Sequence, residues 1–257
     1  MPCATWPPDR LHFLQAPAGG LPPDLDPSTS GIGKEDSETQ EFTVMNEQDL
    51  EEYKIKQLGD RNDLRGTLRI FGLENVGSKE EALEANLAAK ERLTVLELCW
   101  ERDSRRPNAE AEAQVIEGLC PPVQLQHLEI WDFHGSSYPS WIVGAQSGGP
   151  TELRRLFFWR CSQLGPAPKL ENFLHLQLLW LDDCSWDALP DNMERLSSLK
   201  KLFIIACLNI RWLPALPPSL EELNVVSCDA AFTRSCQTTG HPNWQKIEHI
   251  PKKMISC

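Results

Sequence analysis

Four segments in the second half of the chain repeat one alternation of apolar and polar positions. Each reads L-x-x-L-x-[apolar]-x-x-C, and the copies begin at Leu153, Leu176, Leu199 and Leu220, which are 23, 23 and 21 residues apart. The apolar residues at positions 4 and 6 alternate with polar or aromatic neighbours, so the pattern predicts a short strand with one buried face. Because one strand cannot bury that face alone, we expect the copies to stack as a parallel sheet over a continuous core.

Position 9 of each copy is a cysteine, and it falls where the chain turns out of the strand. A small hydrogen-bonding group there can satisfy backbone groups that the turn buries. We therefore predict a structural cysteine ladder of Cys161, Cys184, Cys207 and Cys228. The pattern and its period are those of leucine-rich repeats. They predict an α/β leucine-rich-repeat solenoid (a horseshoe) of about seven irregular repeats with a parallel concave sheet.

The first half of the chain carries longer and less regular repeats. Strands are expected at residues 41–45, 64–70, 93–98 and 125–130, although the first leucine of the second segment stands one residue out of pattern. Ser78 and Glu81 form a capping box that opens a helix, and Asn108 can cap a second helix. The early repeats should therefore carry helices on the convex side, whereas the later ones use turns or single 3₁₀ turns.

Three regions are expected along the chain. Residues 1–41 are rich in proline, glycine and acidic side chains, which predicts a poorly ordered segment. Residues 42–228 hold the repeats. Residues 229–257 lack the pattern and are interpreted as a C-terminal cap, in which apolar side chains fold over the edge of the last strand; these are Cys236, Trp244, Ile247 and Ile250.

The net charge and the cysteine content limit which classes of partner and which cellular compartment are expected. The net charge of −12 argues against a nucleic-acid or anionic-membrane partner. The sequence has no apolar run long enough to span a membrane and no secretory leader. It also has no N-x-[ST] glycosylation site. We expect free thiols in a reducing compartment, which is the cytoplasm or the nucleus.

The concave face is the best candidate for a functional site, because large aromatic side chains recur at positions 5 and 7, which point away from the core. Exposed tryptophans near arginine have the composition of a protein-binding hot spot. The alternative is that the rings pack on one another and stabilise the sheet. The candidate protein-binding residues are Trp100, Trp131, Arg155, Phe157, Trp159, Trp180, Asp182 and Phe203.

Catalytic and metal sites are not indicated. No nucleophile elbow is present, and no Cys–His pair is marked as a nucleophile and its base. Cys228, Cys236, His241 and His249 could ligate a metal, but their gaps of 8, 5 and 8 match no usual zinc spacing. We predict a non-enzymatic protein with no metal and no cofactor.

Several motifs resemble the repeat region of plant nucleotide-binding leucine-rich-repeat disease-resistance proteins of the coiled-coil type. They are LRGTLRI at 64–70, GLENV at 72–76, EEA at 80–82, LELCW at 96–100, YPSW at 138–141 and GHPNWQKIEHIP at 240–251. The resemblance covers residues 42–257. It implies recognition of a pathogen effector or a guarded host protein, and restraint of a nucleotide-binding switch domain. The phosphate-binding motif G-x-x-x-x-G-K-[ST] is missing, so a switch domain would have to act in trans.

Other interpretations remain open at this point. The chain could be a regulatory or decoy fragment that acts on another receptor without sensing an effector. It could be an extracellular repeat protein such as a hydrolase inhibitor, although it lacks a leader and the L-x-G-x-I-P repeat style. It could also be an unexpressed gene remnant.

Overall fold

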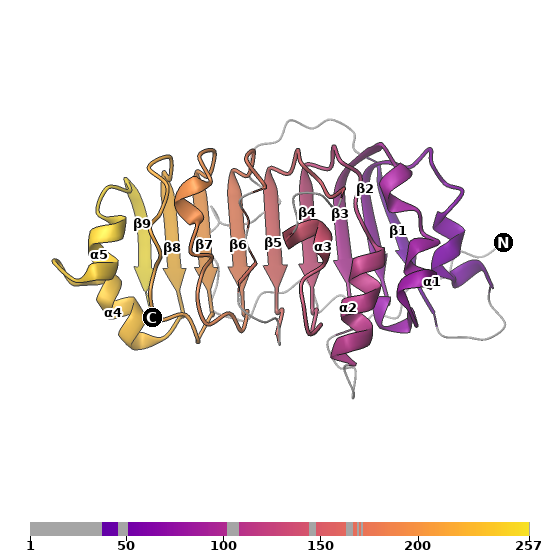
Figure 1. Cartoon of the computed structure of the whole chain (residues 1–257). Coiled ribbons are helices and arrows are strands. Elements are labelled where there is room, and N and C mark those ends of the chain that lie inside the picture. Colours follow the sequence, from indigo (N-terminus) through magenta and orange to yellow (C-terminus); the bar gives the residue numbers. More distant parts are fainter. Residues whose placement is uncertain are drawn as a thin grey trace. The chain divides into compact units, whose positions relative to one another are not determined.

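The computed structural model contains one nine-stranded parallel sheet. The structure describes residues 38–45, 51–101, 108–143, 148–162, 167–168, 170 and 172–256. The strands pair in chain order, from β1 to β9 (Figure 1). Their bounds are β1 Thr39–Thr43, β2 Arg65–Phe71, β3 Arg92–Cys99, β4 His127–Trp131, β5 Arg155–Trp159, β6 Leu178–Asp182, β7 Lys201–Ile205, β8 Glu222–Val226 and β9 Lys252–Ser256.

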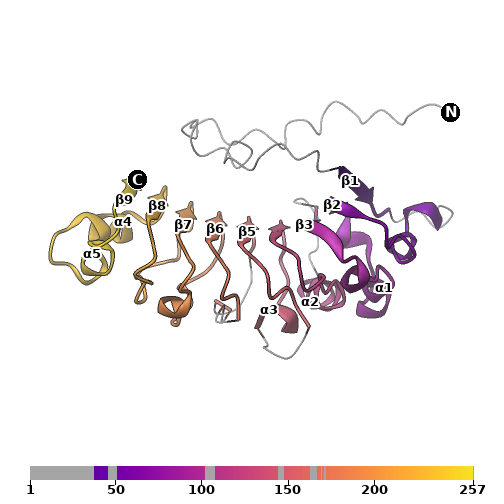
Figure 2. The same ribbon diagram turned by 90° about the horizontal axis from the view of Figure 1, so that it is seen from above.

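Helices cover one face of this sheet (Figure 2). The α-helices are α1 Lys79–Leu83, α2 Ala109–Gly118, α3 Ser140–Val143, α4 Ala230–Gln237 and α5 Pro242–Ile247. The 3₁₀ helices are η3 Glu51–Tyr53, η4 Ile55–Leu58, η5 Leu73–Asn75, η6 Leu87–Ala89 and η7 Met193–Arg195. The α-helices α1, α2 and α3 all fall between β2 and β5, whereas the shorter connections from β5 to β8 contain η7 as their described helix.

The expected helix caps are present. Ser78 Oγ accepts a hydrogen bond from the Glu81 amide, and the Glu81 carboxylate accepts one from the Gly77 amide. Asn108 Oδ1 accepts from the Ala111 amide at the start of α2. These bonds satisfy amides that have no partner inside the helix.

The seven expected repeats correspond to β2–β8, which confirms the leucine-rich-repeat fold. Positions 1, 4 and 6 are buried throughout the later repeats; in the repeat of β6, Leu176, Leu179 and Leu181 all have an exposed fraction of 0%. The pairing of β2 with β3 changes register between Gly66 and Thr67. This irregularity lies in the repeat whose first leucine stands out of pattern.

The C-terminal end contains a strand, β9, that the repeat pattern does not predict. β9 pairs with β8 in parallel after the two helices α4 and α5. Buried Asn243 holds these elements to the last repeat: its Oδ1 accepts from the Leu213 amide, and its Nδ2 donates to the Arg211 carbonyl and to Ser235 Oγ. Lys253 Nζ donates to the carbonyl of Ile247 at the end of α5.

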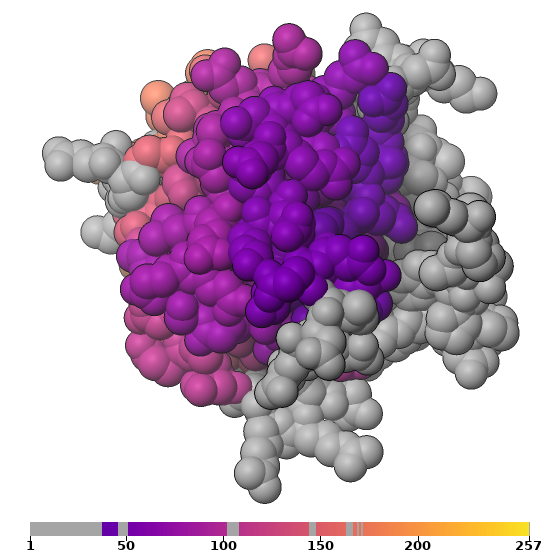
Figure 3. Space-filling view, turned by 90° about the vertical axis from the view of Figure 1, so that its right-hand side faces the viewer, coloured from indigo at the N-terminus to yellow at the C-terminus, as the bar shows by residue number. Residues whose placement is uncertain are grey.

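The N-terminal end of the core is closed by η4. Ile55 and Leu58 are fully buried there. Lys90 is also buried, and its Nζ donates to the carbonyl oxygens of Leu58 and Arg61. In Figure 3 the indigo and purple atoms of the first repeats form a continuous surface at this end. A buried ammonium that is hydrogen-bonded to carbonyls stabilises a turn that would otherwise leave these oxygens unpaired.

Candidate functional site

The face of the sheet turned away from the helices, here called the outer face, is built from three rows of side chains. Strand register aligns positions 3, 5 and 7 of neighbouring strands across the sheet. The central row reads, from β1 to β9, Glu41, Arg69, Glu97, Glu129, Phe157, Trp180, Phe203, Asn224 and Met254. The row therefore changes from charged to aromatic between β4 and β5.

Aromatic rings pack against one another over β4–β7, and we call this group the aromatic cluster: Trp131, Phe157, Trp159, Trp180 and Phe203. Trp131 and Trp159 stack with ring centroids 4.6 Å apart and an interplanar angle of 13°. Trp180 lies 5.4 Å from Trp159 and 4.6 Å from Phe203. Aromatic pairs at such distances are favourable beyond the area that they bury.

Glu129 anchors the cluster from the central row of β4. Its Oε2 accepts hydrogen bonds from the indole nitrogens of Trp131 at 3.0 Å and Trp159 at 3.1 Å. Its Oε1 lies 2.9 Å from His127 Nε2. The residue Glu129 is 8% exposed, so its carboxylate is shielded from water. Its hydrogen bonds therefore hold both indoles in a fixed orientation. The sequence places Glu129 on the outer face but does not indicate that one carboxylate joins two tryptophans.

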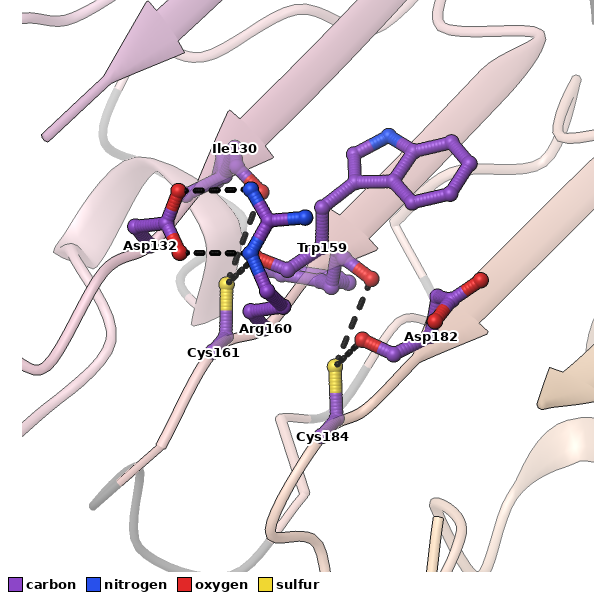
Figure 4. A network of polar contacts seen from close by, with 8 residues as sticks. Ile130, Asp132, Trp159, Arg160, Cys161, Asp182 and Cys184 are labelled. Carbon is purple, nitrogen blue, oxygen red and sulfur yellow. Dashed lines mark hydrogen bonds and ion pairs between the residues drawn. The ribbon is translucent and has the colours of Figure 1, made fainter. Parts of the chain in front are cut away.

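Arg160 also contacts the Trp131 ring. Its guanidinium forms a two-pronged ion pair with Asp132, with both N–O distances at 2.7 Å (Figure 4). The guanidinium carbon also lies 5.5 Å from the centroid of the Trp131 ring. Trp131 thus contacts both a cation and the Trp159 ring, and these contacts restrict its movement.

The expected site residues differ in how much surface they present. Trp131, Arg155, Trp159 and Asp182 are partly exposed. Phe157, Trp180 and Phe203 lie on the same face by register, but each is 3% exposed. Fewer side chains of the predicted site are therefore accessible to a partner than the alternation of apolar and polar positions predicts.

Trp100 does not belong to this face, which corrects the prediction. It is 5% exposed and joins the hydrophobic core, where its ring lies 5.0 Å from that of Phe133. The residue stands at position 8, beyond the end of β3, where the chain has already turned out of the sheet. The alternation of side chains along a strand therefore does not predict where the Trp100 side chain points.

Two carboxyl groups of the outer face, those of Asp182 and Glu97, have raised pKa values. Burial raises the pKa of Asp182 to about 6, and Asp183 acts in the same direction. Burial also raises the pKa of Glu97, and the neighbouring Glu129 adds to this effect. Both carboxyl groups hold a proton more tightly than usual because their charged forms are poorly solvated.

The cysteines at position 9 lie at the turn after each strand. Cys161 Sγ donates to the Ile130 carbonyl of the preceding strand, and Cys184 Sγ donates to that of Phe158 at 3.3 Å (Figure 4 shows both thiols). Cys228 Sγ donates to the Ile204 carbonyl. Cys207 Sγ donates to the Ile205 carbonyl of its own strand. Each of these thiols therefore donates to a backbone carbonyl at the turn.

The residues just before these cysteines adopt left-handed backbone conformations, with φ between 50° and 53° at Arg160, Asp183, Ala206 and Ser227. Burial raises the pKa of the Cys228 thiol to about 12, so the thiol is a poor nucleophile at neutral pH. The seven described cysteines have free thiols.

Within the described part of the chain, no three His, Cys, Asp or Glu side chains gather in a way that could hold a metal ion. No helix in that part is long and apolar enough to cross a membrane.

The repeats, the parallel sheet and the ladder define a leucine-rich-repeat protein of the α/β class. The model of the R13L1/DRL21 leucine-rich repeats matches residues 55–184, which is just over half of the chain. The chain therefore belongs to this family, which confirms its resemblance to the repeat regions of plant disease-resistance proteins.

Curated relatives carry names that agree with this family. The chain is 40% identical over 187 residues to putative disease resistance protein RGA4 of Solanum bulbocastanum, covering 67% of this chain and 19% of that protein. It is 27% identical over 222 residues to putative disease resistance RPP13-like protein 1 of Arabidopsis thaliana, covering 68% of this chain and 21% of that protein. The chain thus spans about a fifth of the length of these two relatives.

Proposed function

We propose that this chain is a protein-recognition module of a plant intracellular immune receptor. It would act in defence by sensing a pathogen effector or a guarded host protein, by restraining a nucleotide-binding switch domain, or both. The family membership supports the defence role, since the relatives are named as disease-resistance proteins. The free thiols of the described cysteines agree with a reducing compartment, such as the cytoplasm or the nucleus.

The aromatic cluster is the observation that carries the proposed binding role. Trp131 and Trp159 are partly exposed, yet Glu129 and Arg160 fix their rings. Rigid aromatic side chains lose little conformational entropy on binding, and such residues dominate binding energy at protein interfaces. A cluster held in place before the partner arrives suits recognition better than stabilisation of the sheet alone.

The test compares the partners of matched tryptophan variants. The full chain, Trp159→Ala and Trp212→Ala are purified in reducing buffer and used to capture proteins from leaf extract for quantitative mass spectrometry. Trp212 is the control because its side chain is 56% exposed and lies outside the cluster. We expect the bound set to be depleted by Trp159→Ala and unchanged by Trp212→Ala.

The captured protein is then purified, and its affinity for each variant is measured directly. A loss of at least tenfold with Trp159→Ala, at an unchanged melting temperature, supports recognition through the cluster. Equal affinity of Trp159→Ala and the unmodified chain would contradict it. Binding of a purified nucleotide-binding domain, with no binding of an effector or guarded protein, would favour the regulatory role over sensing.

A further inference from the structure

The two edge strands of the sheet, β1 and β9, differ in how their outer edges are protected (Figure 1). In β9, the Lys252 amide and the Ser256 carbonyl bond to β8, so the main chain of Ile255 between them points to the outer edge. Gln237 Nε2 of α4 donates to the Ile255 carbonyl oxygen at 2.8 Å. β9 also carries two lysines, which natural edge strands use to prevent further pairing.

The outer edge of β1 lacks this protection. The Val44 amide donates to the Phe71 carbonyl of β2 at 2.9 Å. Because the main-chain groups of alternate residues point to the same side of a strand, those of Thr39, Glu41 and Thr43 point away from β2. Among the described residues, no hydrogen bond reaches these groups. β1 contains neither lysine nor proline. It is therefore open to pairing with a further strand.

The core side of β1 is also incompletely covered. Gln40 and Phe42 occupy positions 4 and 6, level with Leu68 and Ile70 of β2. Gln40 and Phe42 are partly exposed, whereas Leu68 and Ile70 are 1% and 0% exposed. A strand beside β1 would cover the exposed part of Phe42, and apolar side chains on that strand make this burial favourable.

Charge specifies the side chain that faces Glu41 on the outer face. The central row begins with Glu41, Arg69 and Glu97, whose signs alternate. Arg69 lies 2.8 Å from Glu97 and 3.4 Å from Glu41, and the Glu41 side chain remains 49% exposed. Opposite charges across neighbouring strands stabilise their pairing. The residue of an added strand that complements Glu41 is therefore a lysine or an arginine.

A second copy of the chain fits this edge poorly. Antiparallel pairing of two β1 strands would bring the two Glu41 side chains close together, and like charges across strands are destabilising. Each chain also carries a net charge of −12, so two copies repel each other. Charge thus favours a cationic partner over a second copy.

We propose that the outer edge of β1 pairs with a β-strand of a partner protein. This strand carries Lys or Arg opposite Glu41 and apolar residues at the two positions beside it. Its main chain bonds to Thr39, Glu41 and Thr43, which is the mode of recognition by strand addition. The site goes beyond the proposed function, because it lies on β1 and does not use the aromatic cluster.

Amide hydrogen exchange, measured by NMR on the full chain, tests whether the edge is free. We expect the amides of Thr39, Glu41 and Thr43 to exchange at least roughly tenfold faster than those of Phe42 and Val44, which point to β2. Slow exchange of the first three amides without a partner would show that the edge is already occupied, which overturns the proposal. Sedimentation velocity then shows whether a second copy is the occupant.

Capped, fluorescently labelled peptides of about nine residues test the occupant, since that length exceeds the length of β1. They alternate Thr and Val and carry Arg, Gln or Glu at the centre, on the face opposite to the valines. A fourth peptide has proline in place of two valines and cannot form a strand. Affinity is measured by fluorescence anisotropy. We expect the Arg peptide to bind about threefold more tightly than the Gln peptide and to protect the three amides.

Variants of β1 locate the binding site. Thr43→Pro removes an outward amide and keeps the bonds to β2, so it should weaken every peptide by roughly tenfold. Thr43→Val keeps the amide and is the matched control. Protection of the Val44 amide in both variants verifies that β1 still pairs with β2. Thr43→Pro therefore tests the edge without removing the strand.

A charge variant tests the predicted pair. Glu41→Gln should abolish the preference for Arg over Gln. Glu194→Gln, at an exposed position in η7, changes the net charge equally and should keep this preference.

The possible failures are distinguishable from failure of the proposed function. Equal affinity of the peptides for Thr43→Pro and Thr43→Val, or equal binding of the proline peptide, would overturn strand addition at β1. Equal affinity of the Arg and Glu peptides would overturn the cationic partner. Trp159→Ala should leave peptide binding unchanged, so the extract experiment decides the role of the aromatic cluster independently.

Discussion

The early and late repeats share one backbone plan but stabilise their outer faces in different ways. In β2–β4 the central row consists of Arg69 and Glu97, which form an ion pair, and Glu129, whose carboxylate contacts His127 and two indole N–H groups. In β5–β7 the same row consists of Phe157, Trp180 and Phe203, each in contact with another ring. The strand pairing is continuous across the change. Side chains at row positions can therefore change in chemistry without altering the sheet.

The two regions also differ on the helical side. Position 9 is buried Leu73 in the repeat of β2, exposed Glu101 in that of β3 and buried Phe133 in that of β4. From β5 onward it is cysteine, whose thiol donates to a backbone carbonyl. The longer early connections contain the α-helices α1, α2 and α3, whereas the turns of the late repeats contain a hydrogen bond from a thiol to a carbonyl.

The largest expected effect concerns the core, where the two regions should behave alike. Leu96→Ala in β3 and Leu179→Ala in β6 each remove a fully buried side chain. We expect each to lower the free energy of unfolding by roughly 2–5 kcal/mol, measured by chemical denaturation. Leu208→Ala, at a side chain that is 60% exposed, is the control. A loss below about 0.5 kcal/mol at Leu179 would show that position 4 is not a core position.

The second prediction tests the junction between the regions. Glu129→Ala leaves two indole N–H groups without their acceptor, so we expect a loss of about 1–3 kcal/mol in unfolding free energy. Tryptophan fluorescence should change as the rings lose their orientation. Glu129→Gln keeps an acceptor and should lose less. Equal stability of all three proteins would mean that the rings hold their positions without Glu129.

The third prediction uses the pH dependence of stability. The pKa of Asp182 is about 6 in the folded protein, which is above its value in an unfolded chain. The folded state therefore binds this proton more tightly, and the contribution of Asp182 to stability should fall as the pH rises from about 4 to 6. Asp182→Asn should remove roughly 1–2 kcal/mol of this fall, and Asp191→Asn should keep it. Identical slopes for all proteins would contradict the burial of the charge.

The smallest expected loss of unfolding free energy concerns the cysteine at position 9, which occurs in the late repeats and not in the early ones. Cys184→Ala removes a thiol donor to the Phe158 carbonyl, and we expect it to lower the unfolding free energy by about 1 kcal/mol. Cys184→Ser keeps a donor of similar size and should recover part of the loss. Thermal melting in reducing buffer measures both. A stability loss for Cys184→Ser as large as that for Cys184→Ala would indicate that packing, and not the hydrogen bond, matters at position 9.

The repeats were predictable because their pattern is local. The leucines at positions 1, 4 and 6 recur within nine residues, and this periodicity indicates strand and core without knowledge of distant residues. The capping residues Ser78 and Asn108 were predictable for the same reason. Strand β9 follows no such pattern, since its residues are largely exposed and its pairing depends on where α4 and α5 place it.

The sequence by itself determined the order of strands β2–β8, their buried leucine positions and the side chains at positions 3, 5 and 7 of the strands, because each follows from periodicity within one repeat. The tertiary structure decided how those side chains meet. Glu129 joins two tryptophans, and Trp100 enters the core. These contacts join residues on neighbouring strands or beyond a strand end. Their geometry depends on register and side-chain packing, which no single repeat encodes.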